Sequence, residues 1–207
     1  MSISHGAPPP AKKRRKRSPE EAQDEALTAA RLLLLEKGPN AVTLAAVGKA
    51  VGMTHANVIH HFGSAAGLQS ALMGSMVRDL TLALDVAVAH VRSDAAAPRQ
   101  LIDIVFDAFE KGGAGRLAAW IALSGDLSRL DPVQQAMDDL VQAIKDKLGE
   151  NSEAAHKRIS SSVLLIATMA FGDALIGGPL RGLLGREDDA GRKVTAQLLP
   201  SFFPGQK

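Results

Sequence analysis

The sequence predicts an all-α protein in which three short N-terminal helices precede a larger helical domain. Through most of the 207 residues, apolar side chains recur three and four positions apart, which is the periodicity of an amphipathic helix. Ser, Thr and Pro stand where these runs begin and Gly where they end, as helix capping requires. A chain of this length can bury ample core in one or two domains.

The first predicted helix begins after Ser18 and ends at Gly38. Ser18 is expected to cap it, Pro19 suits its first position, and Glu21 completes a Ser-x-x-Glu capping box. Its Ala and Leu residues repeat at helical spacing, so we expect this helix to pack over the two helices that follow it.

The stretch Thr43–Phe62 has the pattern of two short helices joined by a tight turn. Thr43 and Thr54 can each cap a helix, because a Thr hydroxyl accepts a hydrogen bond from a backbone N–H. Gly52 permits the positive φ that the turn needs, and Gly48 lacks a side chain where the two helices would cross. This pattern predicts a helix-turn-helix, whose second helix reads the major groove of DNA.

The segment that begins at Gly52, GMTHANVIHHFGSAAGL, resembles the signature of the TetR family of bacterial transcriptional regulators. The positions that match in order and spacing are Gly52, Met53, Thr54, His61, Phe62, Ser64 and Leu68. The resemblance implies an N-terminal three-helix helix-turn-helix DNA-binding domain and a larger C-terminal helical domain for ligand binding and dimerisation. It also implies two partners, a double-stranded DNA operator and a small-molecule inducer.

Asn57 is the best candidate for reading a base, because its amide can pair bidentately with adenine. His55 and His60 can donate hydrogen bonds to phosphates or base acceptors, and Ala56 or Ile59 can contact a thymine methyl group. The residues of the predicted domain that we expect to contact DNA are Thr43, Thr54, His55, Ala56, Asn57, Ile59 and His60.

Residues 1–17 have little potential to fold and end in the basic run Lys12, Lys13, Arg14, Arg15, Lys16 and Arg17. Without these six, 18 basic residues face 22 acidic ones, so this arm turns a charge of −4 into the overall +2. The resemblance adds that relatives commonly contact phosphates through a Tyr and a Lys where this chain has Ile59 and Ala65. We therefore expect the arm to follow phosphates or enter a minor groove, the alternative being a solvated tail.

More helices are expected along the rest of the chain. A fourth should start at Ser64, and Gly67 in its first turn is expected to weaken it by up to ~1 kcal/mol relative to Ala. The later helices are predicted over Ser75–His90, after Pro98, over Arg116–Ser124, after Asp131-Pro132, over Ile159–Ile176 and over Asp188–Leu199.

The residues that could line an apolar cavity between these helices are Phe106, Phe109, Trp120, Leu123, Met137 and Met169. Ordinary core packing is the alternative at each position, and the cavity follows from the inducer that the resemblance implies. Several Met, Leu and Val residues with few aromatics suggest an adaptable, mostly hydrophobic ligand. Asp173 or Asp126 would orient the polar end of such a ligand, unless each is only a solvated residue or a helix cap.

The run Ile159–Ile176 is apolar nearly all round, and a helix of that kind must be covered on every side. A membrane span is one interpretation, but the run is short and contains Ser160–Ser162 and Asp173. We expect it to pack against its own subunit on one face and a second copy on the other, with Gly177-Gly178-Pro179 ending the helix. The prediction is a homodimer with no membrane segment.

The sequence disfavours several other kinds of site. It contains no Cys, which excludes disulfides and thiolate metal ligands and fits a reducing cytoplasm. His55 and His60 lie outside the i, i+4 register and have no nearby carboxylate, so no metal site is predicted. Gly113–Ala118 fits the dinucleotide fingerprint but follows a helical run instead of a strand. No cofactor and no catalytic residue are predicted.

The predicted organisation is a basic arm at 1–17, a DNA-binding domain at 18–70, and a ligand-binding and dimerisation domain at 71–207. The resemblance implies a ligand-responsive homodimeric transcriptional regulator, a repressor released from a palindromic operator by a small, mostly hydrophobic molecule. Such a protein would be bacterial and cytoplasmic, and nucleoid-associated when bound to DNA. The alternatives are a helical interaction protein with a vestigial helix-turn-helix and a helical enzyme that processes a small molecule.

Overall fold

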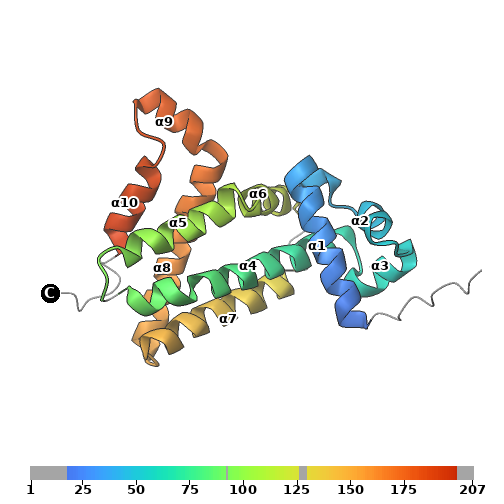
Figure 1. The fold of residues 1–207 in the computed structure, drawn as a ribbon, viewed down its shortest axis with the longest axis horizontal. Coiled ribbons are helices and arrows are strands. Elements are labelled where there is room, and N and C mark those ends of the chain that lie inside the picture. The colour runs from blue at the N-terminus through green and yellow to red at the C-terminus, as the bar shows by residue number, and fades with distance from the viewer. Residues whose placement is uncertain (1–17, 92, 126–129, 200–207) are drawn as a thin grey trace, which may run out of the picture.

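The computed structural model describes residues 18–91, 93–125 and 130–199, and these ranges are helical apart from short connections (Figure 1). The N-terminal helices are α1 (Pro19–Lys37), the 3-10 helix η1 (Pro39–Ala41), α2 (Leu44–Val51) and α3 (His55–Phe62). The larger C-terminal part contains α4 (Ala65–His90), α5 (Ala97–Glu110), α6 (Ala114–Ser124), α7 (Asp131–Leu148), α8 (Glu153–Gly172), the π-helix η2 (Asp173–Gly177), α9 (Gly178–Leu184) and α10 (Ala190–Leu198).

The N-terminal helices lie at one end of the molecule, and α4 extends from them into the larger part beside α7 (Figure 1). Helices α5 and α6 follow one another along another side of α4, and α8 packs against both α5 and α7. At the far end, α9 stands away from the body, and after a turn α10 returns to pack against α5 (Figure 1). The predicted all-α fold class is confirmed.

Local capping explains where the N-terminal helices begin. Ser18 Oγ accepts a hydrogen bond from Glu21 N at 3.1 Å, and Glu21 Oε2 accepts one from Ser18 N at 3.0 Å. These two bonds form the predicted capping box, which satisfies two backbone donors that have no partner within the helix. Ser64 caps α4 in the same sense, accepting from Gly67 N at 3.0 Å.

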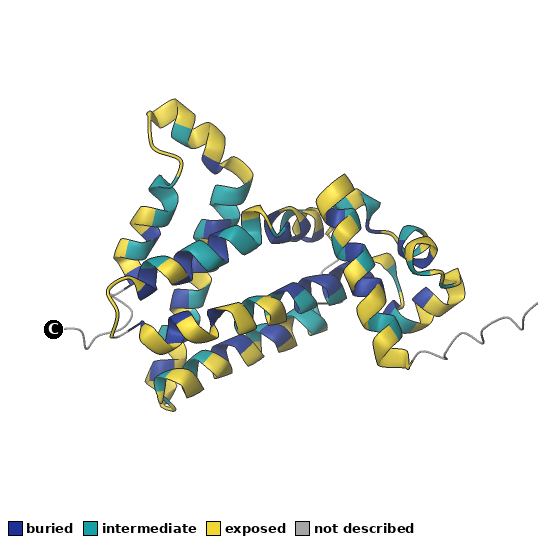
Figure 2. Ribbon diagram, viewed as in Figure 1, coloured by how far each residue is buried: buried dark blue, intermediate teal, exposed yellow. Residues whose placement is uncertain are grey.

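Two apolar cores hold the helices together, and the helix faces that contribute to them are buried in Figure 2. The first core joins α1, α2 and α3 to the first half of α4 and to α6. The second joins the rest of α4 to α5, α7, α8 and Leu199. Phe109 packs against both cores, so the two are in direct contact through one side chain.

Helix α4 differs from the prediction in its length. The sequence suggested one helix after Ser64 and another over Ser75–His90, whereas the structure has a single helix, Ala65–His90. The predicted boundary between residues 70 and 71 therefore falls inside a continuous helix. No Pro interrupts this stretch, and Gly74 is tolerated because α4 packs closely on α7 there: a Cβ at Gly74 would lie 2.6 Å from the Pro132 carbonyl oxygen.

The prediction that Gly177-Gly178-Pro179 ends the long apolar helix is wrong. The chain passes from α8 through η2 into α9, and Pro179 stands in the first turn of α9, directly after the π-helical turn. By length and composition Glu153–Leu184 could cross a membrane, but the core helix of a soluble protein meets the same criteria. Only 22% of its most apolar window is buried, so this helix presents apolar surface.

Gly67 has a different role from the one predicted. A Cβ at this position would overlap the carbonyl oxygen of Phe62, the last residue of α3. The chain turns so tightly between α3 and α4 that only Gly fits there. The expectation that Gly67 simply weakens α4 relative to Ala is therefore wrong, because the alternative residue would push the two helices apart.

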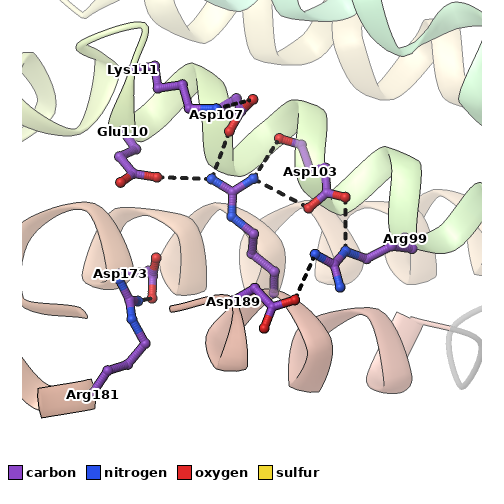
Figure 3. A network of polar contacts seen from close by, with 9 residues as sticks. Arg99, Asp103, Asp107, Glu110, Lys111, Asp173, Arg181 and Asp189 are labelled. Atoms are coloured by element: carbon purple, nitrogen blue, oxygen red, sulfur yellow. Dashed lines mark hydrogen bonds and ion pairs between the residues drawn. The ribbon is translucent and has the colours of Figure 1, made fainter. Parts of the chain in front are cut away.

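Helix α10 is held on α5 by a network of ion pairs (Figure 3). The Arg192 guanidinium donates to Asp107 at 2.7 Å, to Glu110 at 2.9 Å and to Asp103 at 3.3 Å. The same guanidinium lies 5.5 Å from the centre of the buried Phe106 ring, which adds a cation–π contact. Arg99 links Asp103 to Asp189 from the other side of the network.

The network changes the acidity of its carboxylates. Burial alone would raise the pKa of Asp107, but hydrogen bonds from Arg192 and Lys111 outweigh burial, so its pKa lies below the ordinary 3.8. A carboxylate with a lowered folded-state pKa stabilises the fold fully above its unfolded pKa and loses that contribution as the pH falls through the folded value. The docking of α10 is therefore expected to be acid-sensitive.

Replacing Gly67 by Ala should destabilise the protein by about 1–3 kcal/mol, because the added Cβ forces α3 and α4 apart. Gly172→Ala is the matched control, since a Cβ at Gly172 meets nothing within 4 Å. The control should be neutral or should gain up to ~1 kcal/mol from helix propensity. Urea denaturation of both variants checks this; a Gly67→Ala protein as stable as wild type would show that the turn is not tight.

Replacing Arg192 by Met should cost about 1–2 kcal/mol of unfolding free energy, because three carboxylates are deprived of a shared donor. The difference from wild type should shrink below pH 3.8 as Asp107 protonates. Lys157→Met is the control: its 4.0 Å pair with Glu153 is exposed, so it should have little effect. Thermal denaturation at pH 7 and pH 3 distinguishes these outcomes, and a pH-independent difference would contradict the assignment.

Candidate nucleic-acid interface and ligand cavity

The helix-turn-helix is built by two caps and two glycines. Thr43 Oγ1 accepts from Ala46 N at 3.1 Å, and Thr54 Oγ1 accepts from Asn57 N at 3.3 Å. Gly52 ends α2 in the left-handed conformation, with φ of 67°. A Cβ at Gly48 would lie 2.9 Å from the Met53 carbonyl oxygen, so the absence of a side chain lets the turn approach α2. The sequence predictions for these positions are confirmed.

Helix α3 buries one face and presents the other. Val58 and Phe62 are in the first core, which fixes the rotation of α3 on the domain. The seven predicted DNA-contacting residues of this domain are all exposed: Thr43, Thr54, His55, Ala56, Asn57, Ile59 and His60. Asn57 thus lies on the surface of a short helix whose inner side chains anchor it, which is the arrangement a recognition helix requires.

The exposed surface of α3 carries polar and apolar groups but no Lys or Arg. Between residues 18 and 70 the basic residues are Arg31, Lys37 and Lys49, and Arg31 already forms an ion pair with Asp79 of α4. The folded domain therefore offers few cations to phosphates. The arm residues Lys12, Lys13, Arg14, Arg15, Lys16 and Arg17 lie outside the residues that the structure describes.

A cavity of about 90 Å³ lies between α4, α5, α7 and α8. Its walls are mostly Leu, Val and Ile side chains, joined by Phe109 from α5 and Met137 from α7. Among the described residues, Ser162 is the one polar member of this lining, and its hydroxyl donates to the Ile159 carbonyl oxygen at 2.8 Å. The cavity can therefore offer a ligand apolar contacts and the lone pairs of one hydroxyl.

Of the seven residues predicted to line a ligand site, the structure brings two, Phe109 and Met137, to this cavity. Phe106 is buried in the second core, where Arg192 covers its ring. Trp120 and Leu123 lie on the surface of α6, with 41% and 87% of their areas exposed. The expectation that all of these side chains share one cavity is wrong, because α6 turns that face outward.

Met169 and Asp173 line a different hollow, a groove of about 370 Å³ between α8, η2 and α9 on one side and α10 on the other. Asp173 does not point there as a free carboxylate, because it is ion-paired with Arg181 of α9 (Figure 3). Asp126, the alternative to Asp173, lies outside the described residues.

Sequence reasoning missed the aliphatic walls of the cavity, including Leu84, Leu140 and Ile166. These residues have the same helical spacing as any core position, so no local pattern separates them. It also missed the acidic ladder of α5. Asp103, Asp107 and Glu110 recur at i, i+4, i+7, and that spacing could have indicated a charged face with a basic partner.

No group of three or more His, Asp or Glu side chains that could hold a metal ion is present among the residues that the structure describes. His60 and His61 stack edge to face, with ring centres 5.7 Å apart, and His61 also contacts Phe62. His60 lies on the exposed surface of α3, so it belongs to the candidate interface with DNA.

Comparison with known proteins gives a match for the N-terminal helices and for the fold. Residues 26–72 match the family model described as bacterial regulatory proteins, tetR family. The multidrug binding protein EbrR, solved in complex with ethidium, is similar with a TM-score of 0.57 and 17% identity, over 86% of this chain and 98% of that one. A protein from Saccharomonospora viridis, solved in complex with choline, is similar with a TM-score of 0.54 and 18% identity, over 87% and 96%.

The search of curated proteins found no match. At these identities the similarity to solved structures concerns the fold, whereas the family match falls on the helix-turn-helix itself, from α1 to the first turns of α4. The helix-turn-helix at residues 26–72 therefore matches that of the tetR family of bacterial regulatory proteins, and the chain shares its fold with solved structures over most of its length.

Proposed function

We propose that this chain is a homodimeric repressor that leaves a palindromic DNA operator when a small, mostly hydrophobic molecule enters its larger domain. The observation that supports this most directly is the joint presence of an exposed α3 and an enclosed apolar cavity in one continuous structure. Phe109 lines that cavity and also packs against the core beneath α3. A change at the cavity therefore has a physical route to the reading surface.

The proposed reading of DNA uses two copies of α3. In a two-fold dimer the two helices would enter successive major grooves about 34–36 Å apart, so the operator would be roughly palindromic. Asn57 would pair with an adenine, and Thr43, Thr54, His55 and His60 would donate to phosphates or base edges. Ala56 and Ile59 supply apolar contacts for thymine methyl groups.

The proposed dimer uses the far end of the molecule. Leu164 of α8 is 69% exposed and lies in the run Ile159–Ile176, which the sequence predicted to be shared with a second copy. Leu183 of α9, beyond that run, is 84% exposed. Exposed apolar area of this kind is stabilised when a partner covers it, and a two-fold axis pairs the same patch on both subunits. Dimerisation through α8 and α9 would leave α3 of each copy free.

The proposed inducer is uncharged. Among the described residues no charged side chain lines the enclosed cavity, and a buried ion without a partner is strongly disfavoured. The solved relatives were crystallised with ethidium and with choline; the aliphatic lining of this cavity favours a different chemistry. At about 90 Å³ the cavity is smaller than the roughly 150 Å³ that holds benzene in an engineered protein, so a larger ligand must displace the helices around it.

Displacement of those helices is the source of the proposed response. A ligand shifts an equilibrium only by its difference in affinity between two states, and a ligand too large for the present cavity binds the expanded state better. A 100-fold loss of operator affinity would need about 2.7 kcal/mol of such coupling.

Functionally, we assign residues 1–17 to phosphate binding, 18–70 to DNA reading, and 71–207 to ligand binding and dimerisation, with α4 shared between the last two. This regulator would work in the cytoplasm and would have no catalytic step.

Operator binding tests the proposal. The full chain should bind one DNA fragment flanking its own reading frame specifically at low salt, measured by fluorescence anisotropy. Asn57→Ala should weaken that binding by about 1–3 kcal/mol, roughly tenfold or more, and leave non-specific binding unchanged. Gln100→Ala, which removes an exposed amide from α5, should bind like wild type.

Two outcomes would contradict this proposal. If no fragment is bound specifically, the helix-turn-helix is vestigial and the chain is better described as a helical interaction protein. If the chain is strictly monomeric in solution at the concentrations that bind DNA, the palindromic operator has no structural basis.

The basic arm should supply most of the electrostatic affinity. Deleting residues 1–17 should flatten the slope of log affinity against log salt by up to ~0.9 for each phosphate that the arm neutralises in the wild type. Deleting only residues 1–11, which contain no Lys or Arg, is the control and should leave the slope unchanged. Equal slopes for the wild type and the 1–17 deletion would show that the folded domain makes the phosphate contacts.

A further inference from the structure

The groove between η2, α9 and α10 has features of a ligand site of its own. It measures about 370 Å³ and does not share a lining residue with the enclosed cavity. Its walls combine apolar side chains with a buried ion pair, and it lies where the helix changes from α to π geometry. Turns of π-helix occur frequently at functional sites.

The ion pair at the base of the groove joins Asp173 to Arg181, and 13% and 16% of these side chains are exposed. Two glycines make room for it. A Cβ at Gly177 would lie 2.5 Å from Asp173 Oδ1 and 2.7 Å from Arg181 Nη1, and a Cβ at Gly191 of α10 would lie 2.7 Å from Asp173 Oδ1. The backbone of both helices thus closes on the pair from two sides.

Arg181 is only partly satisfied by Asp173. Its Nε is buried and has no hydrogen-bond partner. A buried N–H without an acceptor costs about 1–3 kcal/mol, so an acceptor that reached it would be bound favourably. Arg186 also lines the groove, and no carboxylate pairs with it among the described residues. The lining carries two guanidinium groups against one carboxylate, a net charge of +1.

We propose that this groove binds an amphipathic monoanion, with a carboxylate on Arg181 and Arg186 and an apolar body against Met169, Leu180 and Val194. The planar guanidinium offers paired donors that match a carboxylate. The apolar walls exclude a small hydrophilic anion as the best ligand, and the net positive charge excludes a cation. This inference rests on the groove alone and goes beyond the operator and inducer proposed above.

A second copy of the chain is a less favourable occupant. Leu164 and Leu183, the exposed leucines proposed for dimerisation, do not line the groove, although Leu184 of α9 does. A second copy would bring the same net positive charge to the groove, and like charges facing one another across an interface are disfavoured. The groove lies between α8, η2 and α9 on one side and α10 of the same chain on the other.

The groove is mechanically connected to the helix-turn-helix through α6. A Cβ at Gly115 would lie 2.9 Å from the Cβ of Ala174 in η2, and a Cβ at Gly113 would lie 3.1 Å from Leu35 and 3.2 Å from Leu34 of α1. The start of α6 is therefore packed between η2 and α1. A ligand that moves η2 would press on α1 through this contact.

The experiment titrates the full chain, without DNA, with dodecanoate and with dodecan-1-ol by isothermal calorimetry below micelle concentrations. Dodecanoate should bind at least tenfold more tightly than the alcohol. Gly172→Leu should weaken dodecanoate at least tenfold, because Gly172 lines the groove. A Cβ at this position meets nothing within 4 Å, so the backbone there can carry a side chain, and circular dichroism of the variant checks that the fold is kept. Arg181→Lys keeps the charge but removes Nε, and should weaken dodecanoate more than the alcohol.

Two matched variants act as controls. Gly182→Leu adds the same side chain on α9, at a position that does not line the groove, and a Cβ there is also free of contacts, so binding should be unchanged. Ala167→Leu fills the enclosed cavity and should also leave dodecanoate binding unchanged. Equal affinities for acid and alcohol, unchanged binding in Gly172→Leu, or weakened binding only in Ala167→Leu would each overturn the proposal, and none of them depends on operator binding.

Discussion

A continuous apolar contact joins the helix-turn-helix to the larger domain, and the arrangement of the whole chain depends on it. Leu68 of α4 and Leu117 of α6 are fully buried in the same core as Val58 of α3. Such a core is close-packed, so a displacement on one side is transmitted to the other instead of being absorbed. Helix α3 and the helices of the larger domain are therefore coupled through one core.

The basic residues are distributed unevenly between α3, the N-terminal arm and the opposite end of the molecule. The surface of α3 provides shape and hydrogen bonds with no fixed cation, while the basic run of the arm carries six of the 24 Lys and Arg residues. In the proposed function, recognition of base edges and attraction to phosphates therefore belong to separate segments. At the opposite end, Arg192 gathers three carboxylates, so the basic and acidic residues of α5 and α10 are used to hold the fold.

The sequence predicted those features that depend on neighbouring residues. The caps at Ser18, Thr43, Thr54 and Ser64 and the turn at Gly52 involve contacts within three or four positions, and all five are present. For the same reason the family signature could be identified, because it lies within one such stretch.

Features that depend on distant contacts could not be predicted in this way. From the sequence, Gly67 is only a residue of low helix propensity, because the close approach of the Phe62 carbonyl oxygen is visible only in the structure. In the same way, the sequence does not indicate that Gly74 packs against the Pro132 carbonyl oxygen. The wall of the cavity is indistinguishable from core by spacing alone, so Trp120 and Leu123 were assigned to the wrong surface. The helical run also continues past Pro179, which the sequence predicted to end it, because the π-helix η2 leads directly into α9.

Trp120 is the one tryptophan of the chain, and the sequence contains no tyrosine. It is 41% exposed and stands on α6, the helix whose first turn lies between η2 and α1. Its indole ring is therefore the sole strong near-ultraviolet emitter, and the wavelength of its fluorescence is sensitive to how far water reaches that ring. The native protein thus carries an intrinsic optical probe on the helix that touches both of its halves, and no label has to be introduced.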